Sequence, residues 1–385
     1  MAIRAEELPA DAAMRAPADV LALRRAALWA LLGAKLLAGW GVRWDIQWHV
    51  QIGRDSFWIP PHLMTYTGVT LVVLLSFGVL VRETWCARAA GGTSPPATIR
   101  LLGLTGTRGF HVAAWGVSIT VLAAPIDDLW HRLFGLDVTI WSPPHLLGFL
   151  GAAVNTIGCL LIAREVYAPG SRARLVATIV AGAWLLATLR WTIQESAVVA
   201  YLHGGVRFQT YAMLAALILP LALVTTGRLS AHCWAPLLMI LVLLPVGLAG
   251  DGIARVGFAL LEPVSVIEEE IARNPTSPIA VDRAIARKNG GTPGGPADLM
   301  PLLALIPAAV MGAVDPRRRP VAAALGYAAT VFAVSGWALA RSPAFQPLVP
   351  GPAEWAVAFG LTLVAGVAGG LAARRLADAV AAGSP

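Results

Sequence analysis

The sequence predicts an all-α, polytopic integral membrane protein, and three observations support that prediction. Hydrophobic residues make up 57% of the 385 residues and charged residues only 13%, a composition far from that of soluble globular proteins. The mean hydropathy is correspondingly high, at +0.69. Apolar stretches of about twenty residues, the length of helix that crosses a bilayer core, recur from one end of the chain to the other.

Ten of these apolar stretches are long enough to be predicted as membrane-spanning helices. They lie at residues 21–43, 62–81, 110–127, 144–164, 174–194, 208–227, 233–251, 298–314, 320–340 and 354–373. The spans divide the chain into four parts. These are an N-terminal segment at 1–20, a helical bundle at 21–251, a loop at 252–297 and a C-terminal three-helix membrane segment at 298–385.

The basic residues indicate how the chain is oriented. Arginines cluster in alternate connections, at Arg15, Arg24, Arg25, Arg82, Arg88, Arg100, Arg108, Arg164, Arg172, Arg174, Arg228, Arg317–Arg319 and Arg374–Arg375. Basic residues mark the cytoplasmic side of inner-membrane proteins, so both termini are predicted to be cytoplasmic. The loop at 252–297 also carries basic residues, namely Arg255, Arg273, Arg283, Arg287 and Lys288, but long loops translocate largely regardless of charge. We therefore attribute the net charge of +7 to topology, and expect lipid rather than nucleic acid around the chain.

Two stretches on the outer side repeat one pattern of potential metal ligands. The first, WDIQWHVQIGRDSFWIPPH, covers residues 44–62, and the second, DDLWHRLFGLDVTIWSPPH, covers 127–145. Four of the seven histidines of the chain lie in these two copies. Aligned, the copies match Asp45 with Asp127, His49 with His131, Asp55 with Asp137, Trp58 with Trp141, and Pro60-Pro61-His62 with Pro143-Pro144-His145.

The spacing within each copy predicts that its ligand residues come together. An aspartate and a histidine four residues apart stack on one face of a helix. After a turn, a Pro-Pro pair suits the first turn of the next helix, which brings the second histidine to that helix start. The predicted sets are Asp45, His49 and His62 in the first copy, and Asp127, His131 and His145 in the second.

This combination of side chains is typical of a transition-metal site. Imidazole with carboxylate suits Cu(II), Zn(II) or Fe(II), whereas Cu(I) sites favour Cys or Met ligands, which both copies lack. An aromatic belt with interfacial hydrogen bonds is the alternative interpretation. Because the ligand-type residues recur in both copies, we favour a metal site, and copper, zinc and iron all stay open as the metal at this point.

Further residues near the two copies have several interpretations. Asp55 and Asp137 are metal ligands, turn-capping residues or carboxylates that orient a histidine, and we favour the last role. Asp128, Glu195 and His203 lie on the same predicted side. They are interpreted as groups that support a metal site or line the approach to it, or as solvated loop residues.

Tryptophans recur in and just before the first copy. Trp40, Trp44 and Trp48 recur every four residues and therefore share one helical stripe. Tryptophan is enriched at membrane–water boundaries, so this stripe is predicted to be an interfacial belt.

The two copies resemble the copper motifs in the C subunit of the ammonia and methane monooxygenases. The Asp-x3-His-x12-His set of that family matches Asp45, His49 and His62. A second copper set of the family, Asn-x3-His-x13-His, matches the spacing of Asp127, His131 and His145, with Asp in place of Asn. The resemblance covers roughly the first half of the chain.

The resemblance implies a copper-binding subunit, or a relative of one, of a copper-dependent membrane monooxygenase that oxidises a small apolar substrate with O2. It also implies partner subunits like those of the family, and small residues in the last span favour a homo-oligomer. The sequence assigns no catalytic residue. The alternatives are a membrane protein that handles or transports copper or zinc without catalysis, and a scaffold in which the Asp/His sets only join helices.

Overall fold

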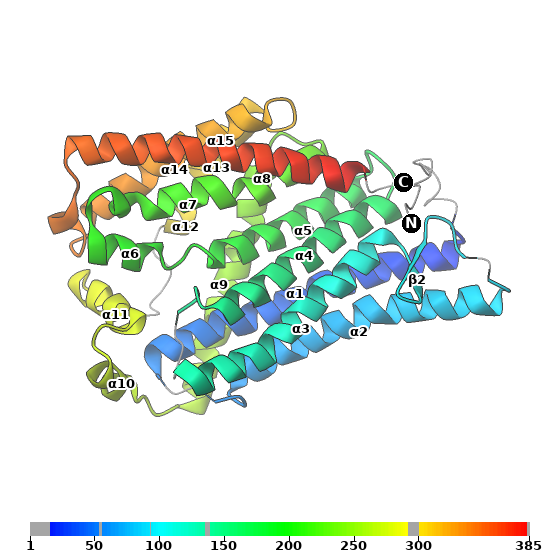
Figure 1. Cartoon of the computed structure of the whole chain (residues 1–385), viewed down its shortest axis with the longest axis horizontal. Coiled ribbons are helices and arrows are strands. Elements are labelled where there is room, and N and C mark those ends of the chain that lie inside the picture. The colour runs from blue at the N-terminus through cyan, green and yellow to red at the C-terminus, as the bar shows by residue number, and fades with distance from the viewer. Residues whose placement is uncertain (1–15, 54–55, 93, 135–138, 292–299, 383–385) are drawn as a thin grey trace.

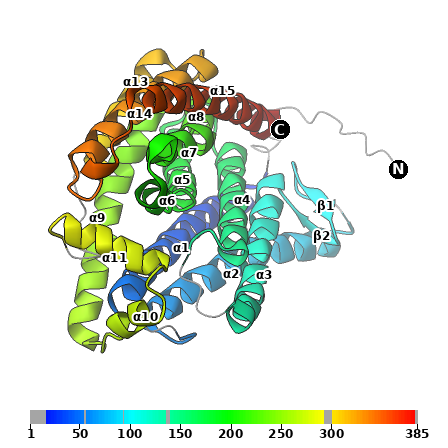
Figure 2. The same ribbon diagram turned by 60° about the vertical axis from the view of Figure 1, so that its left-hand side comes forward.

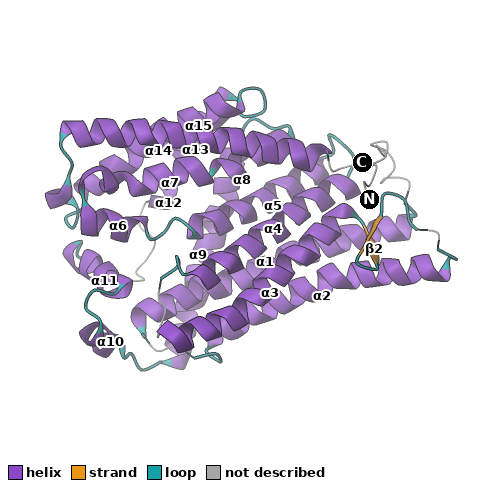
Figure 3. Cartoon of the chain, viewed as in Figure 1, coloured by secondary structure: helices purple, strands orange, loops and turns teal. Residues whose placement is uncertain are grey.

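The structure, a computed structural model, is all-α apart from one short hairpin of strands (Figure 3). It describes residues 16–53, 56–92, 94–134, 139–291 and 300–382. The helices, labelled in Figure 1, are α1 (Ala18–Gln51), α2 (Pro60–Ala89), α3 (Arg108–Phe134), α4 (Pro143–Val166), α5 (Arg172–Trp191), α6 (Ser196–His203), α7 (Thr210–Ile218), α8 (Pro220–Ser230), α9 (Ala235–Leu261), α10 (Ile267–Arg273), α11 (Pro278–Lys288), α12 (Met300–Leu303), α13 (Leu305–Val314), α14 (Pro320–Arg341) and α15 (Pro352–Ala382). Strands β1 (Ile99–Leu101) and β2 (Leu104–Gly106) pair antiparallel, and η2 (Gly205–Gln209) and η3 (Gln346–Leu348) are 3-10 turns.

Among the described residues, eight helices are long and apolar enough to cross a membrane. The all-α class and the multi-pass membrane character predicted from composition are therefore confirmed. The other two predicted spans lie on helices that do not belong to these eight. The stretch 21–43 lies in α1, which is continuous but carries charged side chains, and the stretch 298–314 includes α13, which is only 10 residues long.

The charged side chains inside α1 point to partners within the bundle. Three of them bind partners on other helices, which offsets the cost of a charged side chain among apolar helices. The pairs are Arg24 with Glu83 of α2 at 2.7 Å, Lys35 with Asn155 of α4 at 2.8 Å, and Arg43 with Asp251 of α9 at 2.6 Å. These contacts explain why α1 packs inside the bundle although it carries charged side chains.

The helices α1 to α4 form two hairpins with equivalent packing. A Cβ atom on Gly68 of α2 would lie 2.5 Å from Ala38 N and 2.8 Å from Ala34 O. In the second hairpin, a Cβ atom on Gly151 of α4 would lie 2.5 Å from Thr120 N and 2.8 Å from Gly116 O. Glycine allows the two backbones to approach this closely. The internal repeat therefore extends from the ligand motifs into the helix packing.

The ligand motifs of both hairpins lie at the same end of the bundle. In Figure 1, α1 begins and α15 ends at the right-hand end, whereas α1 and α3 end, and α2 and α4 begin, at the left. The outward faces of the bundle are apolar, with side chains such as Leu74, Leu248 and Val364 exposed by 62%, 64% and 68%. Exposed apolar surface of this kind is what a bilayer covers.

The segment predicted as a loop at 252–297 is largely helical where it is described. The helix α9 ends at Leu261 rather than near residue 251, and α10 and α11 follow it (Figure 2). The prediction ended the span early because charged residues begin at Asp251, but Asp251 is paired with Arg43 and stays buried. The part of the segment at 292–299 lies outside the described residues.

The segment containing α10 and α11, residues 265–289, forms a cap on the end of α1. Val266 N donates to Ile52 O at 2.7 Å, and Ser265 Oγ donates to Gln51 O at 2.6 Å, which satisfies carbonyl groups that the helix end leaves open. Gly53 follows α1 with a φ of +75° and lies directly under Ile267. Glycine is needed there for both the left-handed turn and the close contact.

Candidate metal centre

In the first copy, Asp45 and His49 lie on the last turns of α1 and His62 lies in the first turn of α2. His62 Nε2 is 3.1 Å from Asp45 Oδ1, and His49 Nδ1 is 3.4 Å from the same oxygen. The centroids of the two imidazole rings are 6.2 Å apart. The two predicted histidine ligands of this copy therefore both approach the same carboxylate oxygen of the third, Asp45.

In the second copy, Asp127 and His131 lie near the end of α3 and His145 lies in the first turn of α4. His145 Nε2 is 3.5 Å from Asp127 Oδ1, and His131 Nε2 is 3.5 Å from Asp127 Oδ2. One ligand atom from each residue lies within 4.8 Å of the other two. This is a separation that a single metal ion can bridge, since metal–ligand bonds are about 2 Å long.

A backbone carbonyl orients the second histidine of each copy. His62 Nδ1 is 3.0 Å from Ser56 O, and His145 Nδ1 is 2.7 Å from Thr139 O. Since a carbonyl only accepts, Nδ1 carries the proton in both rings, and Nε2 faces the aspartate as a potential ligand. Such a hydrogen bond is the usual support of a metal-binding histidine.

The aspartates also point to a bound cation. Asp45 Oδ1 and Asp127 Oδ1 are both buried, and imidazole nitrogens of their own copies lie 3.1–3.5 Å from them. A buried carboxylate oxygen needs a positive group beside it, which a protonated imidazole or a bound cation supplies. Burial raises the pKa of Asp45, but the neighbouring His49 and His62 outweigh burial and bring that pKa below its usual range. The carboxylate is therefore ionised and available as a ligand. Among the described residues, the set of the second copy brings one ligand atom from each residue within 4.8 Å of the other two and so fits a transition-metal ion, whereas the set of the first copy is more open in this structure.

Glu195 supports the second copy from outside it. Its Oε1 accepts hydrogen bonds from Ile140 N at 2.9 Å and from Thr139 Oγ1 at 3.3 Å. Thr139 is the residue whose carbonyl orients His145. Glu195, which precedes α6, thus holds the turn whose carbonyl orients His145.

The other residues predicted around the motifs lie elsewhere. Asp128 pairs with Arg132 at 2.7 Å, and both side chains are largely exposed, so Asp128 points away from the three ligands. His203 is exposed at the end of α6. Asp55 and Asp137 lie outside the described residues.

The tryptophan stripe is buried rather than interfacial. Trp44 and Trp48 are only 8% and 7% exposed, and Trp48 stacks on Phe258 of α9 with a centroid distance of 5.8 Å. The prediction of a belt is wrong for these two residues because α9 continues past the first motif and covers them. They form a rigid apolar wall behind the turn of α1 that carries His49.

The positioning groups Ser56 and Thr139 were missed by sequence reasoning. Each lies six residues before the second histidine of its copy, and both are hydroxyl residues in the sequence. The sequence does show a hydroxyl residue at the same position of both copies. It does not show that the backbone carbonyl of that residue contacts the histidine, because such a contact does not depend on the residue type.

The fold and this geometry define the class of protein: an all-α protein with multiple apolar helices and a repeated Asp-His-His cluster at one end of its bundle. No protein-family model, curated protein or solved structure matches the chain.

Proposed function

We propose that this chain is a copper-binding subunit, or a relative of a subunit, of a membrane monooxygenase that oxidises a small apolar substrate with O2. The observation that carries the proposal is the repeated cluster of one aspartate and two histidines on successive helix hairpins. The spacings of the two clusters match those of the copper motifs described above.

Each cluster has a role in this proposal. Asp45, His49 and His62 hold one copper ion, and the second set of Asp127, His131 and His145 holds another. Copper bound there supplies one-electron chemistry with O2. The carbonyl groups of Ser56 and Thr139 keep the histidine Nε2 atoms turned towards the aspartates. The apolar helices around the clusters exclude water and favour a membrane-soluble substrate.

The proposal includes the orientation in the inner membrane. Ten spans place both termini in the cytoplasm and both clusters on the outer face. It is supported by the arginines near the ends of α4, α8 and α15, which lie at the end of the bundle opposite the clusters (Figure 1). Partner subunits of the monooxygenase type, or further copies of this chain, complete the enzyme.

Metal analysis of the purified protein tests the assignment. We expect copper in the wild-type protein and its loss when His49, His62, His131 and His145 are changed to Ala together. The matched control is His203→Ala, which removes an exposed histidine outside both clusters and leaves the copper content unchanged. Copper retained by the fourfold variant contradicts the proposal.

A second function, copper or zinc handling without catalysis, is favoured by one departure from the monooxygenase motif. The second set begins with Asp127 instead of Asn, and the added negative charge stabilises a divalent ion in one redox state. Reductant-dependent O2 consumption by copper-loaded membranes, together with oxidation of a small alkene, separates the two functions. Copper binding without O2 consumption assigns the chain to metal handling.

A further inference from the structure

A cavity of about 170 Å³ lies between the ends of four helical elements, at the end of the bundle opposite the metal centre. Its walls come from the end of α4, the end of α8, the turn between α13 and α14, and the end of α15. The lining residues are Arg164, Arg228, Leu229, Arg317, Ala377, Asp378 and Ala381. With Asp315, which pairs with Arg317, the three arginines meet two aspartates, so the region keeps one net positive charge.

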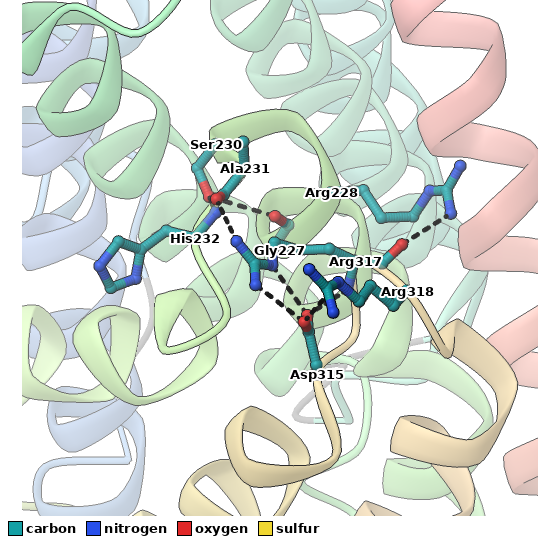
Figure 4. Close-up of polar contacts among 8 residues, drawn as sticks. All are labelled: Gly227, Arg228, Ser230, Ala231, His232, Asp315, Arg317 and Arg318. Atoms are coloured by element: carbon teal, nitrogen blue, oxygen red, sulfur yellow. Dashed lines mark hydrogen bonds and ion pairs between the residues drawn. The ribbon is translucent and has the colours of Figure 1, made fainter.

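Arg317 forms a fixed wall of this cavity (Figure 4). Its Nε and Nη2 atoms donate to the two carboxylate oxygens of Asp315, each at 2.8 Å, and Nη1 donates to Ala231 O at 2.9 Å. Such a bidentate pair has a defined geometry. Arg317 thereby holds the turn before α14 against the end of α8 and shapes the cavity, with its own charge neutralised by Asp315.

Arg228 is held in place but not fully satisfied. Its Nη2 donates to Asp378 Oδ1 at 2.6 Å. Its Nη1 donates to Arg317 O at 3.4 Å, a contact drawn in Figure 4. The Nε atom is buried and has no hydrogen-bond partner among the described residues. A buried guanidinium donor without an acceptor is costly, so an acceptor from outside the chain stabilises this arrangement.

Arg164 adds a second cationic group. It lies in the last turn of α4, and its charge repels that of Arg174 at the start of α5. Arg164 and Arg228 line the same cavity, which raises the local positive potential. A bound anion offsets this repulsion and accepts hydrogen bonds from several guanidinium groups at once.

We propose that this cavity binds a phosphate group of net negative charge, carried either by an anionic phospholipid or by free phosphate. Phosphate oxygens match the donor geometry of arginine, and basic clusters beside membrane helices attract anionic lipids. Leu229, Ala377 and Ala381 add apolar contacts next to the charged groups, as the glycerol and first acyl carbons of a lipid require. The site is independent of the metal centre and of the proposed oxygenase function.

The test uses the full chain in a neutral detergent and measures binding by thermal shift and native mass spectrometry. Three probes distinguish the carrier: short-chain phosphatidylglycerol, inorganic phosphate and zwitterionic short-chain phosphatidylcholine. Saturable binding of phosphatidylglycerol alone assigns a lipid site, and binding of inorganic phosphate alone assigns a free-phosphate site. Binding of both assigns the phosphate group regardless of its carrier. Equal affinity for all three probes, or saturable binding of phosphatidylcholine alone, or of none, overturns the proposal.

Two variants locate the binding in the cavity. Arg164→Gln removes a cation, and Ala381→Glu adds a carboxylate at an exposed lining position, where it does not disturb the core. Both are expected to weaken binding by about tenfold or more, because a charge-assisted contact is lost or an anion is repelled. The matched control, Arg375→Gln, changes an exposed arginine of α15 outside the lining and leaves affinity unchanged. Wild-type affinity in Ala381→Glu overturns the assignment even if Arg164→Gln fails to fold.

Discussion

At the scale of single residues, the candidate metal centre depends on groups that fix side-chain direction. His62 and His145 are each turned towards an aspartate by a hydrogen bond to a carbonyl six residues earlier. In the second copy that carbonyl belongs to a turn held by Glu195. A small movement of this turn moves His145 Nε2 away from Asp127, and so changes the site without changing any ligand.

Glu195→Ala is therefore expected to weaken metal binding at the second cluster by about 10- to 100-fold, the usual effect of losing a group that supports a ligand. Competition titration with a chelator measures the change, and the first cluster serves as an internal reference. Glu195→Gln retains an acceptor oxygen and is expected to recover most of the affinity. An equal loss at both clusters would show that the substitution acts on overall folding instead.

At the scale of helices, the two hairpins depend on close backbone contacts at equivalent positions. Gly68 meets Ala34 and Ala38, and Gly151 meets Gly116 and Thr120. These contacts determine the distance between the paired helices. That distance decides whether an aspartate at the end of one helix reaches a histidine at the start of the next.

Gly151→Ala is expected to destabilise the second hairpin by about 1–3 kcal/mol, the typical cost of overpacking, because its Cβ would overlap the backbone of α3. The control is Gly148→Ala in the same helix, where the nearest atom to the new Cβ is Ala123 Cβ at an ordinary 3.7 Å. Thermal unfolding in detergent compares the two. A melting temperature lowered equally by both substitutions would contradict the packing argument.

At the scale of the whole molecule, the cap of α10 and α11 ties distant parts of the chain together. It covers the end of α1 through Val266 and Ser265. At its other end, Asn289 Oδ1 accepts hydrogen bonds from Ser342 Oγ at 2.7 Å and Ala344 N at 2.9 Å. Lys288 lies over the ring of Tyr201 in α6. The cap thus joins the end of α1 to α6 and to the segment between α14 and α15.

The docking of this cap is expected to weaken as the pH rises. Asp282 in α11 keeps part of its surface exposed, but desolvation by the surrounding protein, reinforced by the charge of Glu195, raises its pKa from 3.8 to about 7. A folded-state pKa above the unfolded value means that protonation stabilises the docked cap. This stabilisation is complete below the unfolded value and is lost as the pH rises towards 7.

Limited proteolysis or hydrogen exchange of residues 265–289 at pH 5 and pH 8 measures the effect. We expect more protection at pH 5 after correction for intrinsic rates. Asp282→Asn cannot ionise and is expected to stay protected at both values. If the variant keeps the same pH dependence as the wild-type protein, Asp282 is not the responsible group.

The sequence was sufficient to predict the class of fold and the identity of the clustered side chains. Apolar stretches are predictive because a bilayer requires helices of a defined length. The four-residue spacing of Asp45 and His49 is predictive because a helix has a defined period. Both signals are local, so they can be recognised without knowing which segments of the chain pack together.

Contacts between distant segments could not be predicted in this way. The end of α9, the burial of Trp44 and Trp48, and the partners of the charges in α1 all depend on residues some 60 to 200 positions away. The span predicted from hydropathy ends at Asp251, because a lone carboxylate in an apolar stretch is costly. The pairing with Arg43 removes that cost, and the helix continues.

The sequence by itself therefore determined the helical membrane class and the repeated set of potential ligands, because composition and helical spacing are properties of the chain alone. The tertiary structure decided how the two hairpins pack, which carbonyl orients each second histidine, and that a helical cap covers the end of α1. It also brought three arginines from separate elements to one cavity. Those features arise from packing between helices, and packing depends on shape and distance that no single stretch of sequence contains.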